Sequence, residues 1–319
     1  MKQRDDPLGR WLARCALAPL GEDRFETPPV GSGRRLFGGL LAAQAALAAM
    51  HTVAAGRLHS LHGYFLRPGR PGATLGFEVT RIRDGRRFAT RRVVVRQLGE
   101  PVFELSAGFT ADEHGVAHAH EPPLDGLSSL EALPPPESLP DWEAVRAAET
   151  GEPPRTPDAI DVRVCRPLED RPEGTPSSHR LVWMRPRGPL PDDPALHAAA
   201  LIYASDRTLL RTAARLHGSL RQRLPASLDH AVWLHHPPRW DDWILYASES
   251  PIAHGGRALV QGRMLTRTGT RLATITQEGL LRRPRPLDPP PPPPPPPPKR
   301  ASSRKGSGSK RQLLPGDRS

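Results

Sequence analysis

The chain has 319 residues and a formal net charge of +11, with 40 prolines, 28 glycines and only 5% aromatic residues. Ten Lys or Arg and two acids fall in Leu281–Ser319, so this tail carries +8 of the charge and leaves +3 for the body, which argues against a nucleic-acid-binding body. The absence of any run of 18 apolar residues argues against a membrane-spanning helix. Cys15 and Cys165 show no metal-ligand spacing, which favours a reducing, cytoplasmic environment and no metal site.

The first part of the chain predicts a helix followed by an antiparallel meander. Met1–Leu20 has the pattern of an amphipathic helix and lacks the apolar region of a signal peptide. Gly38–Met50, "GGLLAAQAALAAM", predicts a helix of small apolar residues, and Leu58–Gly69 predicts a short strand. Phe77–Thr110 predicts three strands, with turns at an Asp-Gly pair and at Gly99.

A segment rich in Pro, Glu and His, Ala111–Thr156, predicts a connector. Two histidines four residues apart can share a metal ion on a helix. A glycine and a Glu-Pro-Pro sequence around them indicate a loop instead, so we expect a solvated linker there. The histidines concerned are His114, His118 and His120.

The last part of the body repeats the first. His197–Ala214 predicts one helix, Ser227–Pro238 a short strand, and Leu245–Leu281 three strands with glycine turns. The spacing from Arg87 to Gly99 and from Arg257 to Gly269 is 12 residues in both copies. The sequence therefore predicts an α+β fold in which a helix wrapped by a curved antiparallel sheet occurs twice.

One residue breaks the repeat on the inner face of its last strand. Gln277 lies 8 residues after Gly269, as Ala107 lies 8 after Gly99, and the alternation of the strand turns both side chains inward. A carboxamide is unfavourable to bury without partners, and only the second copy has one here. A structural bond to a backbone carbonyl would explain Gln277, but the asymmetry favours a functional role.

Two further polar residues interrupt apolar patterns in the second copy. Asp206 lies one helical turn from Ile202 on the apolar stripe of the predicted helix, although it could instead cap the helix or pair with Arg207 at the surface. Ser227, at the start of the following strand, would ordinarily be a turn residue. If the sheet wraps the helix, Asp206, Ser227 and Gln277 converge and could hold and activate one water molecule.

The C-terminal tail has a different composition. Its ten consecutive prolines, Pro289–Pro298, predict a stiff polyproline II rod, and the basic segment that follows predicts disorder. A solvated extension is favoured over docking on an acidic surface, RNA or a membrane, and the sequence names no partner for the tail.

The body resembles the acyl-CoA thioesterase II family, whose members fold as tandem hot dog domains. The blocks that carry the resemblance are "RLFGGLLAAQA", "LHSLHGYFLRPG", "RDGRRFATRRVVVRQLGEPVFELSAGF", "LVWMRPRGPLPDD", "YASDRTLL", "SLDHAVWLHHP", "WILYASESP" and "TITQEGLLR". The resemblance implies a double hot dog with an N-terminal domain at 1–110, a connector at 111–156, a catalytic C-terminal domain at 157–283 and a tail at 284–319.

The resemblance also implies a chemistry. It assigns Asp206 as base or water-orienting group, with Ser227 and Gln277 fixing a water that hydrolyses an acyl-CoA thioester without a cofactor; a homo-oligomer is also expected. Ser227 as a covalent nucleophile with His230 as its base stays open. A hot dog enoyl-CoA hydratase and a non-catalytic acyl-CoA-binding protein are the alternative functions. Leu40 departs from the glutamine that the family pattern has in the first helix.

Substrate contacts are harder to assign. His59 and His62 lie in the strand that corresponds to the one carrying Ser227, and they could line the acyl tunnel or be structural histidines. The coenzyme A phosphates need cationic or backbone partners, and Arg87 and Arg257 are candidates among many arginines. A group of three tryptophans predicts core or interface packing: Trp233, Trp240 and Trp243.

Overall fold

The fold is known from a computed structural model that describes most of the body of the chain. The described residues are 6–29, 35–122, 124, 130–153, 155–165, 178–217 and 226–282. The polyproline rod and basic segment predicted for the tail lie outside these residues.

Two central helices are apolar on every side. The α-helices described are α1 (Pro7–Cys15), α2 (Gly38–Met50), α3 (Trp142–Thr150), α4 (Pro194–Ser205) and α5 (Leu209–Arg215). All residues of α2 from Gly39 to Ala49, and all of α4 from His197 to Ser205, are buried. The two helices pack against each other and not against water, and a Cβ at Gly39 would lie 2.6 Å from the carbonyl oxygen of Tyr203. Gly39 is thus required for the close approach of the start of α2 to the end of α4.

The first half of the sheet confirms the predicted meander. Its strands are β1 (Ala18–Gly21), β2 (Arg24–Thr27), β3 (Arg57–Phe65), β4 (Leu75–Asp84), β5 (Phe88–Gln97) and β6 (Glu100–Thr110). The three strands predicted between Phe77 and Thr110 are β4, β5 and β6, with turns where the sequence placed them. The predicted N-terminal helix is confirmed as α1, but it ends at Cys15, and the unpredicted pair β1–β2 adds to the edge of the sheet.

The second half confirms the second meander and corrects its helix. Its strands are β7 (Ile160–Val164), β8 (His179–Pro186), β9 (Ala226–Ser227), β10 (Asp229–Leu234), β11 (Ile244–His254), β12 (Arg257–Thr266) and β13 (Arg271–Leu280). The prediction of one continuous helix was wrong, because α4 ends at Ser205 and α5 starts at Leu209. The carbonyl of Ser205, which would accept from Leu209 in a continuous helix, accepts instead from the hydroxyl of Tyr246 at 2.8 Å.

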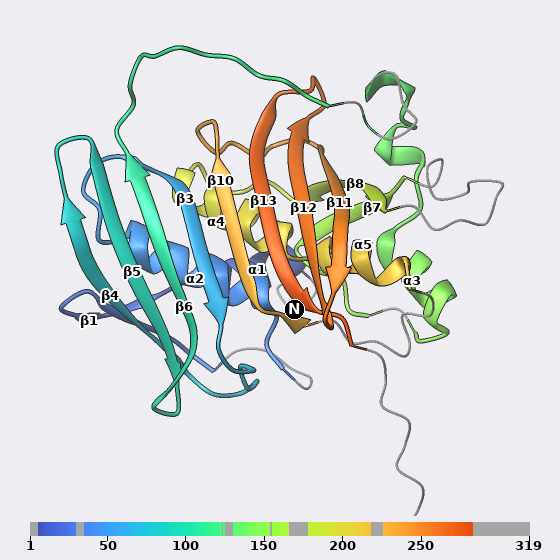
Figure 1. Cartoon of the computed structure of the whole chain (residues 1–319). Coiled ribbons are helices and arrows are strands. Elements are labelled where there is room, and N and C mark those ends of the chain that lie inside the picture. Colours follow the sequence, from blue (N-terminus) through green and yellow to red (C-terminus); the bar gives the residue numbers. More distant parts are fainter. Residues whose placement is uncertain are drawn as a thin grey trace, which may run out of the picture. The chain divides into compact units, whose positions relative to one another are not determined.

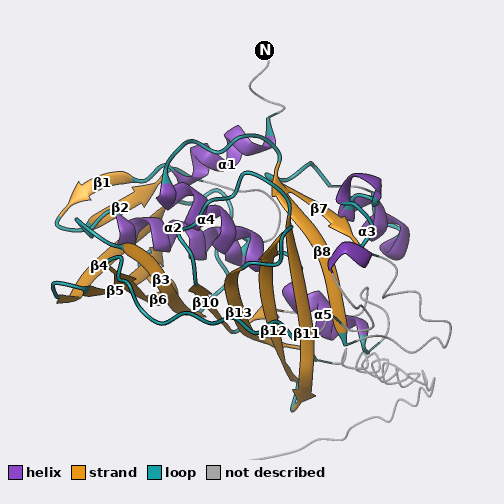
Figure 2. Ribbon diagram, turned by 90° about the horizontal axis from the view of Figure 1, so that it is seen from above, coloured by secondary structure: helices purple, strands orange, loops and turns teal. Residues whose placement is uncertain are grey.

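The described residues form one 13-stranded antiparallel sheet that curves around the helices. Its order is β1-β2-β4-β5-β6-β3-β10-β13-β12-β11-β8-β7, with β9 paired to β13. The two halves join where β3 pairs with β10, and Figures 1 and 2 show α2 and α4 together on one face of the sheet. This is the predicted α+β double hot dog.

The connector covers part of the opposite, outer face of the sheet. Leu124, Leu133 and Leu139 form a second apolar cluster with side chains of β8 and β11 and with Trp243. The connector also contains α3, which the sequence did not predict; Asp141 caps its start, and Gly151 ends it in the left-handed conformation. Trp240 and Trp243 are buried as expected for core residues, whereas Trp233 is 42% exposed.

Candidate active site

The structure brings together the three side chains that interrupt the apolar patterns. The carboxamide Nε2 of Gln277 donates to Asp206 Oδ1 at 3.0 Å and to Ser227 Oγ at 2.5 Å. The hydroxyl of Ser227 in turn donates to Asp206 Oδ1 at 3.4 Å. Gln277 is fully buried, and Asp206 and Ser227 are partly buried.

Three separate elements deliver these side chains. Asp206 caps the C-terminal end of α4, Gln277 lies on the inner face of β13, and Ser227 lies on β9. Ser227 pairs with Gly279, two residues from Gln277 along β13, which places both on the same end of the sheet. Gly279 leaves room for α5, because a Cβ there would lie 2.5 Å from the methyl groups of Leu210.

Two opposing effects act on the pKa of the Asp206 carboxylate. Burial raises its pKa, whereas His230, the Gln277 carboxamide, the backbone N–H of Gly39 and the Ser227 hydroxyl each act to lower the pKa. A carboxylate at the C-terminal end of α4 faces the negative end of that helix dipole. The start of α2 compensates, because a Cβ at Gly38 would lie only 2.9 Å from Asp206 Oδ2.

Arg207, the alternative partner that the sequence allowed for Asp206, has a different partner in the structure. Arg207 forms an ion pair with Asp158 at 2.5 Å, and Asp158 also accepts from the hydroxyl of Tyr203 at 2.7 Å. Asp206 and Arg207 therefore bond to different groups, and the surface pair that the sequence allowed is wrong.

His230 is the functional candidate whose contacts the sequence did not predict. Its Nδ1 lies 2.9 Å from Gln277 Oε1, its Nε2 lies 2.7 Å from the hydroxyl of Ser205, and the side chain is fully buried. From the sequence, the only role suggested for His230 was that of a base for Ser227. A signal was present, because His230 shares the inner face of β10 with Val232, as Gln277 shares that of β13 with apolar residues.

His62 lies on the other face of the sheet from the cluster. It pairs with Ala231, and Ala231 pairs with Thr276, so these three side chains share one face. Thr276 precedes Gln277, whose side chain therefore points to the opposite face. His62 instead contacts Asp229, at 3.0 Å.

The other predicted substrate contacts also have partners away from the cluster. His59 packs beside Gly108 near Phe88, and burial lowers its pKa. Arg87 pairs with Glu113 at 2.8 Å, and Arg257 pairs with Glu278 at 2.9 Å. Arg257 lies opposite Leu280, next to the residue that pairs with Ser227, so it is at the cluster's end of the sheet. A role in substrate binding stays a prediction for all four residues.

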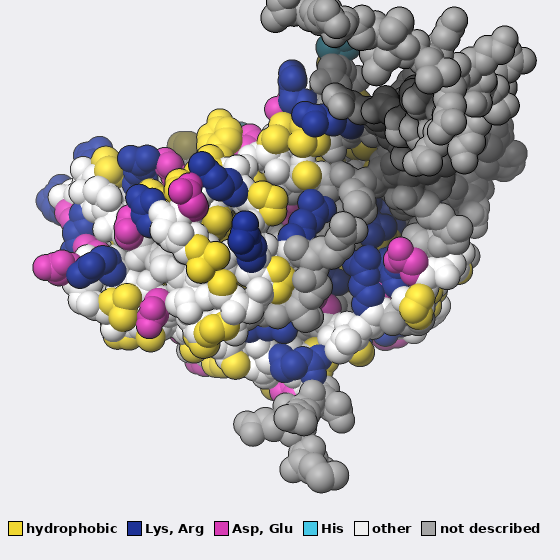
Figure 3. All heavy atoms as spheres, turned by 90° about the horizontal axis from the view of Figure 1, so that it is seen from below, with side chains coloured by type: hydrophobic (Ala, Val, Ile, Leu, Met, Phe, Trp, Pro, Cys, Tyr) yellow, Lys and Arg dark blue, Asp and Glu magenta, His cyan; other side chains and the backbone are white. Residues whose placement is uncertain are grey.

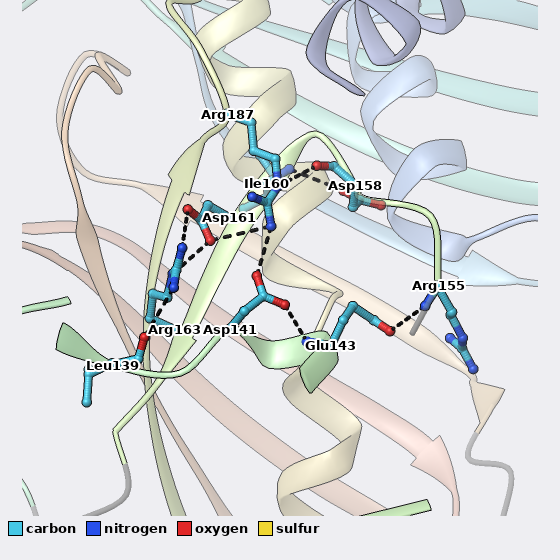
Figure 4. A network of polar contacts seen from close by, with 9 residues as sticks. All are labelled: Leu139, Asp141, Glu143, Arg155, Asp158, Ile160, Asp161, Arg163 and Arg187. Atoms are coloured by element: carbon cyan, nitrogen blue, oxygen red, sulfur yellow. Dashed lines mark hydrogen bonds and ion pairs between the residues drawn. The ribbon is translucent and has the colours of Figure 1, made fainter. Parts of the chain in front are cut away.

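A cavity of about 280 Å³ lies beside α3, between the connector and the edge of the second half. Figure 4 shows a network of polar contacts beside it: Arg187 bonds Asp141 at 3.0 Å and lies 3.5 Å from Asp161. Arg207, which lines the cavity, pairs with Asp158. Arg187 thus ties Asp141 of the connector to Asp161 of β7.

Three further features of the described residues concern metal binding, membrane insertion and surface charge. The segment with His114, His118 and His120 has no helix or strand, as the prediction of a loop required. In the part of the chain that the structure describes, no three His, Cys, Asp or Glu side chains gather as metal ligands. Among the same residues, no helix combines the length and the apolar character needed to cross a membrane. On the left part of the face in Figure 3, basic side chains are interspersed with acidic ones.

The curved antiparallel sheet around two central helices defines a double hot dog fold, and comparison with known proteins specifies the family. Residues 155–280 match the family model "Acyl-CoA thioesterase", and residues 27–110 match "Acyl-CoA thioesterase N-terminal domain". The chain is 34% identical to acyl-coenzyme A thioesterase 8 of Mus musculus, over 83% of this chain and 87% of the relative. It is 33% identical to acyl-CoA thioesterase 2 of Haemophilus influenzae, over 78% and 88% of the two chains.

Solved structures agree with these relatives. The crystal structure of the acyl-CoA thioesterase II TesB2 from Mycobacterium marinum has a TM-score of 0.71 and 38% identity, covering 86% of this chain and 99% of that one. A hot dog protein from Alicyclobacillus acidocaldarius, at 22% identity and a TM-score of 0.71, shares the fold. The chain belongs to the acyl-CoA thioesterase family and is a thioester hydrolase.

Proposed function

We propose that the chain hydrolyses acyl-CoA thioesters by direct attack of a water molecule held by Asp206, Ser227 and Gln277. The observation that carries this proposal is the bond of Gln277 Nε2 to both the carboxylate and the hydroxyl. A carboxylate whose pKa is raised by burial suits a general base, because it binds a proton more readily than an ordinary aspartate. The names of the relatives support acyl-CoA as the substrate.

The chemistry follows from the donors and acceptors in the cluster. Asp206 takes a proton from the water as its oxygen attacks the thioester carbonyl carbon. Gln277 already uses both Nε2 hydrogens on Asp206 and Ser227, and the N–H of Gly39 faces Asp206, so the oxyanion is assigned to other backbone N–H groups near the helices. Breakdown of the tetrahedral intermediate expels the coenzyme A thiolate, which is protonated to the thiol, and leaves the free fatty acid.

The alternative in which Ser227 is a covalent nucleophile has less support. It requires a base that is poised to remove the proton of the hydroxyl. The nitrogens of His230 lie against Gln277 and Ser205, so the histidine does not fill that role. Ser227 is therefore assigned to orient the water, together with Gln277.

Turnover of a panel of acyl-CoAs in the presence of a thiol reagent tests the proposal. Release of free thiol is expected; loss of enoyl absorbance would mean a hydratase, and neither signal would mean a binding protein. Asp206→Asn should lower kcat by about 1,000-fold or more, as loss of a catalytic base does, with acyl-CoA binding largely retained. Asp192→Asn, at an exposed aspartate paired with Arg239, is the matched control and should behave as wild type. Near-normal turnover in Asp206→Asn would contradict the assignment.

The domain division, the assembly and the location are also proposals. The division into 1–110, 111–156, 157–283 and 284–319 is supported by the ranges of the two family models. A cytoplasmic enzyme is supported by Cys15 and Cys165, which are both buried and form no disulfide. A homo-oligomer is proposed from the family resemblance, and sedimentation equilibrium of the full chain tests it.

A further inference from the structure

We propose that His230 is a positioning residue that sets the orientation of the Gln277 carboxamide and, through it, the arrangement of Asp206 and Ser227. This inference rests on the proposed function, since it assigns the group that keeps the water-holding cluster in its reactive arrangement. His230 acts through Gln277 and does not itself touch the substrate.

The hydrogen-bond inventory of Gln277 makes this role necessary. A carboxylate only accepts hydrogen bonds, so the amide of Gln277, and not its carbonyl, must face Asp206. The carbonyl Oε1 then faces His230 Nδ1 at 2.9 Å. A buried carboxamide turned by half a rotation would set its oxygen against Asp206 and its N–H₂ against Nδ1. A proton on Nδ1 makes the productive orientation the stable one.

The partner of His230 Nδ1 requires a proton on that nitrogen. Gln277 Oε1 cannot donate, so Nδ1 carries a hydrogen. Nε2 lies 2.7 Å from the hydroxyl of Ser205, and this hydroxyl donates to the carbonyl of Ile202 at 2.8 Å. The contact with Ser205 holds the imidazole ring with Nδ1 toward Gln277.

The break between α4 and α5 holds the far end of this chain of bonds. Ser205 is the last residue of α4, and its carbonyl accepts from the hydroxyl of Tyr246 on β11 at 2.8 Å. Gly262 makes room for the Tyr246 ring, because a Cβ there would lie 2.5 Å from it. A series of hydrogen bonds therefore links β11, α4, β10 and β13 to the reactive carboxylate of Asp206. It runs through Tyr246, Ser205, His230 and Gln277.

The electrostatic neighbours of the two titratable groups define the expected pH behaviour. Asp206, Asp229 and His62 act on His230, while His230 and Tyr246 are the titratable groups that interact with Asp206. The bond from Gln277 is among the contacts that lower the pKa of Asp206. Loss of the His230 donor frees Gln277 to turn, so the pKa of Asp206 rises and the acid limb of the kcat profile moves to higher pH.

Two substitutions at His230 separate positioning from packing. His230→Leu fills the space without a donor and should lower kcat by about 10- to 100-fold, the range typical of losing a group that orients a functional residue. KM should change less than about threefold, because ground-state binding is retained. His230→Asn places an amide N–H near the position of Nδ1, and should recover most of kcat and return the acid limb to its wild-type pH.

Matched controls and the wild-type chain complete the test. His236→Leu and His236→Asn, at an exposed histidine six residues further on, should leave kcat and the acid limb unchanged. A folded His230→Leu with wild-type kcat would overturn the proposal. So would equal losses in His230→Leu and His230→Asn with unshifted acid limbs, which would indicate packing alone.

A measurement that needs no variant covers the case in which His230→Leu does not fold. Nitrogen-15 chemical shifts of the imidazole in the full wild-type chain distinguish protonation at Nδ1 from protonation at Nε2. A protonated Nδ1 is expected for His230, and an unprotonated Nδ1 would overturn the proposal. This readout is independent of turnover, so it stands or fails separately from the proposed thioesterase activity.

Discussion

The two halves of the molecule place different side chains under the C-terminal ends of their central helices. In the first half Arg91 pairs with Ala107, which pairs with Leu61; in the second, Val260 pairs with Gln277, which contacts His230. Each set of three neighbouring side chains forms a row across the sheet. The first row is an arginine and two apolar residues, and the second row is an apolar residue, an amide and an imidazole.

The row under α2 forms a closed structural site. Arg91 is fully buried and uses all five of its N–H donors, on the Thr52 hydroxyl and carbonyl, the Asp84 carboxylate, and the carbonyls of Arg83 and Thr90. A cation at the C-terminal end of a helix interacts favourably with the dipole. No donor is left for a substrate, so the arrangement stabilises the fold.

The site at the end of α4 has the opposite charge. Asp206 is an anion at the negative end of its own helix, an unfavourable position that the start of α2 and the amide of Gln277 offset. Asp206 is partly buried, whereas Arg91 is fully buried. Under the proposed function, the same scaffold stabilises the fold where the helix end meets its complementary charge, and holds the catalytic carboxylate where it does not.

Among the tests of this comparison, the largest expected effect comes from replacing Gln277 by the alanine that the first half has at the matching position. Gln277→Ala removes the amide that holds Asp206 and Ser227, and should lower kcat by about 100-fold, as the loss of one preorganised donor does. Free-thiol release measures it. The reciprocal Ala107→Gln should add no activity to that variant, because Ala107 pairs with Arg91 in the first half, and Asp206 and Ser227 belong to the second half. A gain of turnover in the double variant would break the comparison.

A smaller effect is expected from removing the arginine of the first row. Arg91→Met leaves the carbonyls of Thr52 and Arg83 without their donor and should lower the free energy of unfolding by about 2–3 kcal/mol. Urea unfolding measures it, and kcat per folded molecule should not change. Arg96→Met, on the same strand at an exposed pair with Glu78, should change the free energy of unfolding by less than about 1 kcal/mol. Equal losses in the two variants would contradict a special role for Arg91.

The smallest effect is a dependence of stability on pH at Asp206. Burial raises its folded-state pKa above the unfolded value, so the folded state binds the proton more tightly. The associated stability is full below about pH 4, the unfolded pKa, and is lost as the pH rises through the raised folded pKa. Asp206→Asn should therefore unfold at higher urea than wild type at pH 7, with the difference vanishing at low pH. A variant less stable than wild type at pH 7 would show that the carboxylate stabilises the fold.

The local pattern of the sequence was sufficient for most elements and for the core of the site. The boundaries of α2 and the meanders β4–β6 and β11–β13 follow from small apolar residues, alternation and glycine turns, which act over a few residues. Gln277 was identifiable because an internal repeat supplied Ala107 for comparison. Asp206 was identifiable because it interrupts an apolar run, and the family resemblance assigned the same residues.

The remaining features depend on contacts between distant parts of the chain. The break after Ser205 depends on Tyr246, 41 residues later, and the role of His230 depends on Gln277, 47 residues later. The pairing of β3 with β10 places His62 on the outer face, although its sequence position matched the region of Ser227. The sequence by itself thus determined most of the helices and strands and which side chains interrupt them, since those are short-range preferences. Only the tertiary structure decided which polar groups meet, because burial and hydrogen-bond partners are set by the packing of strands and helices far apart in the chain.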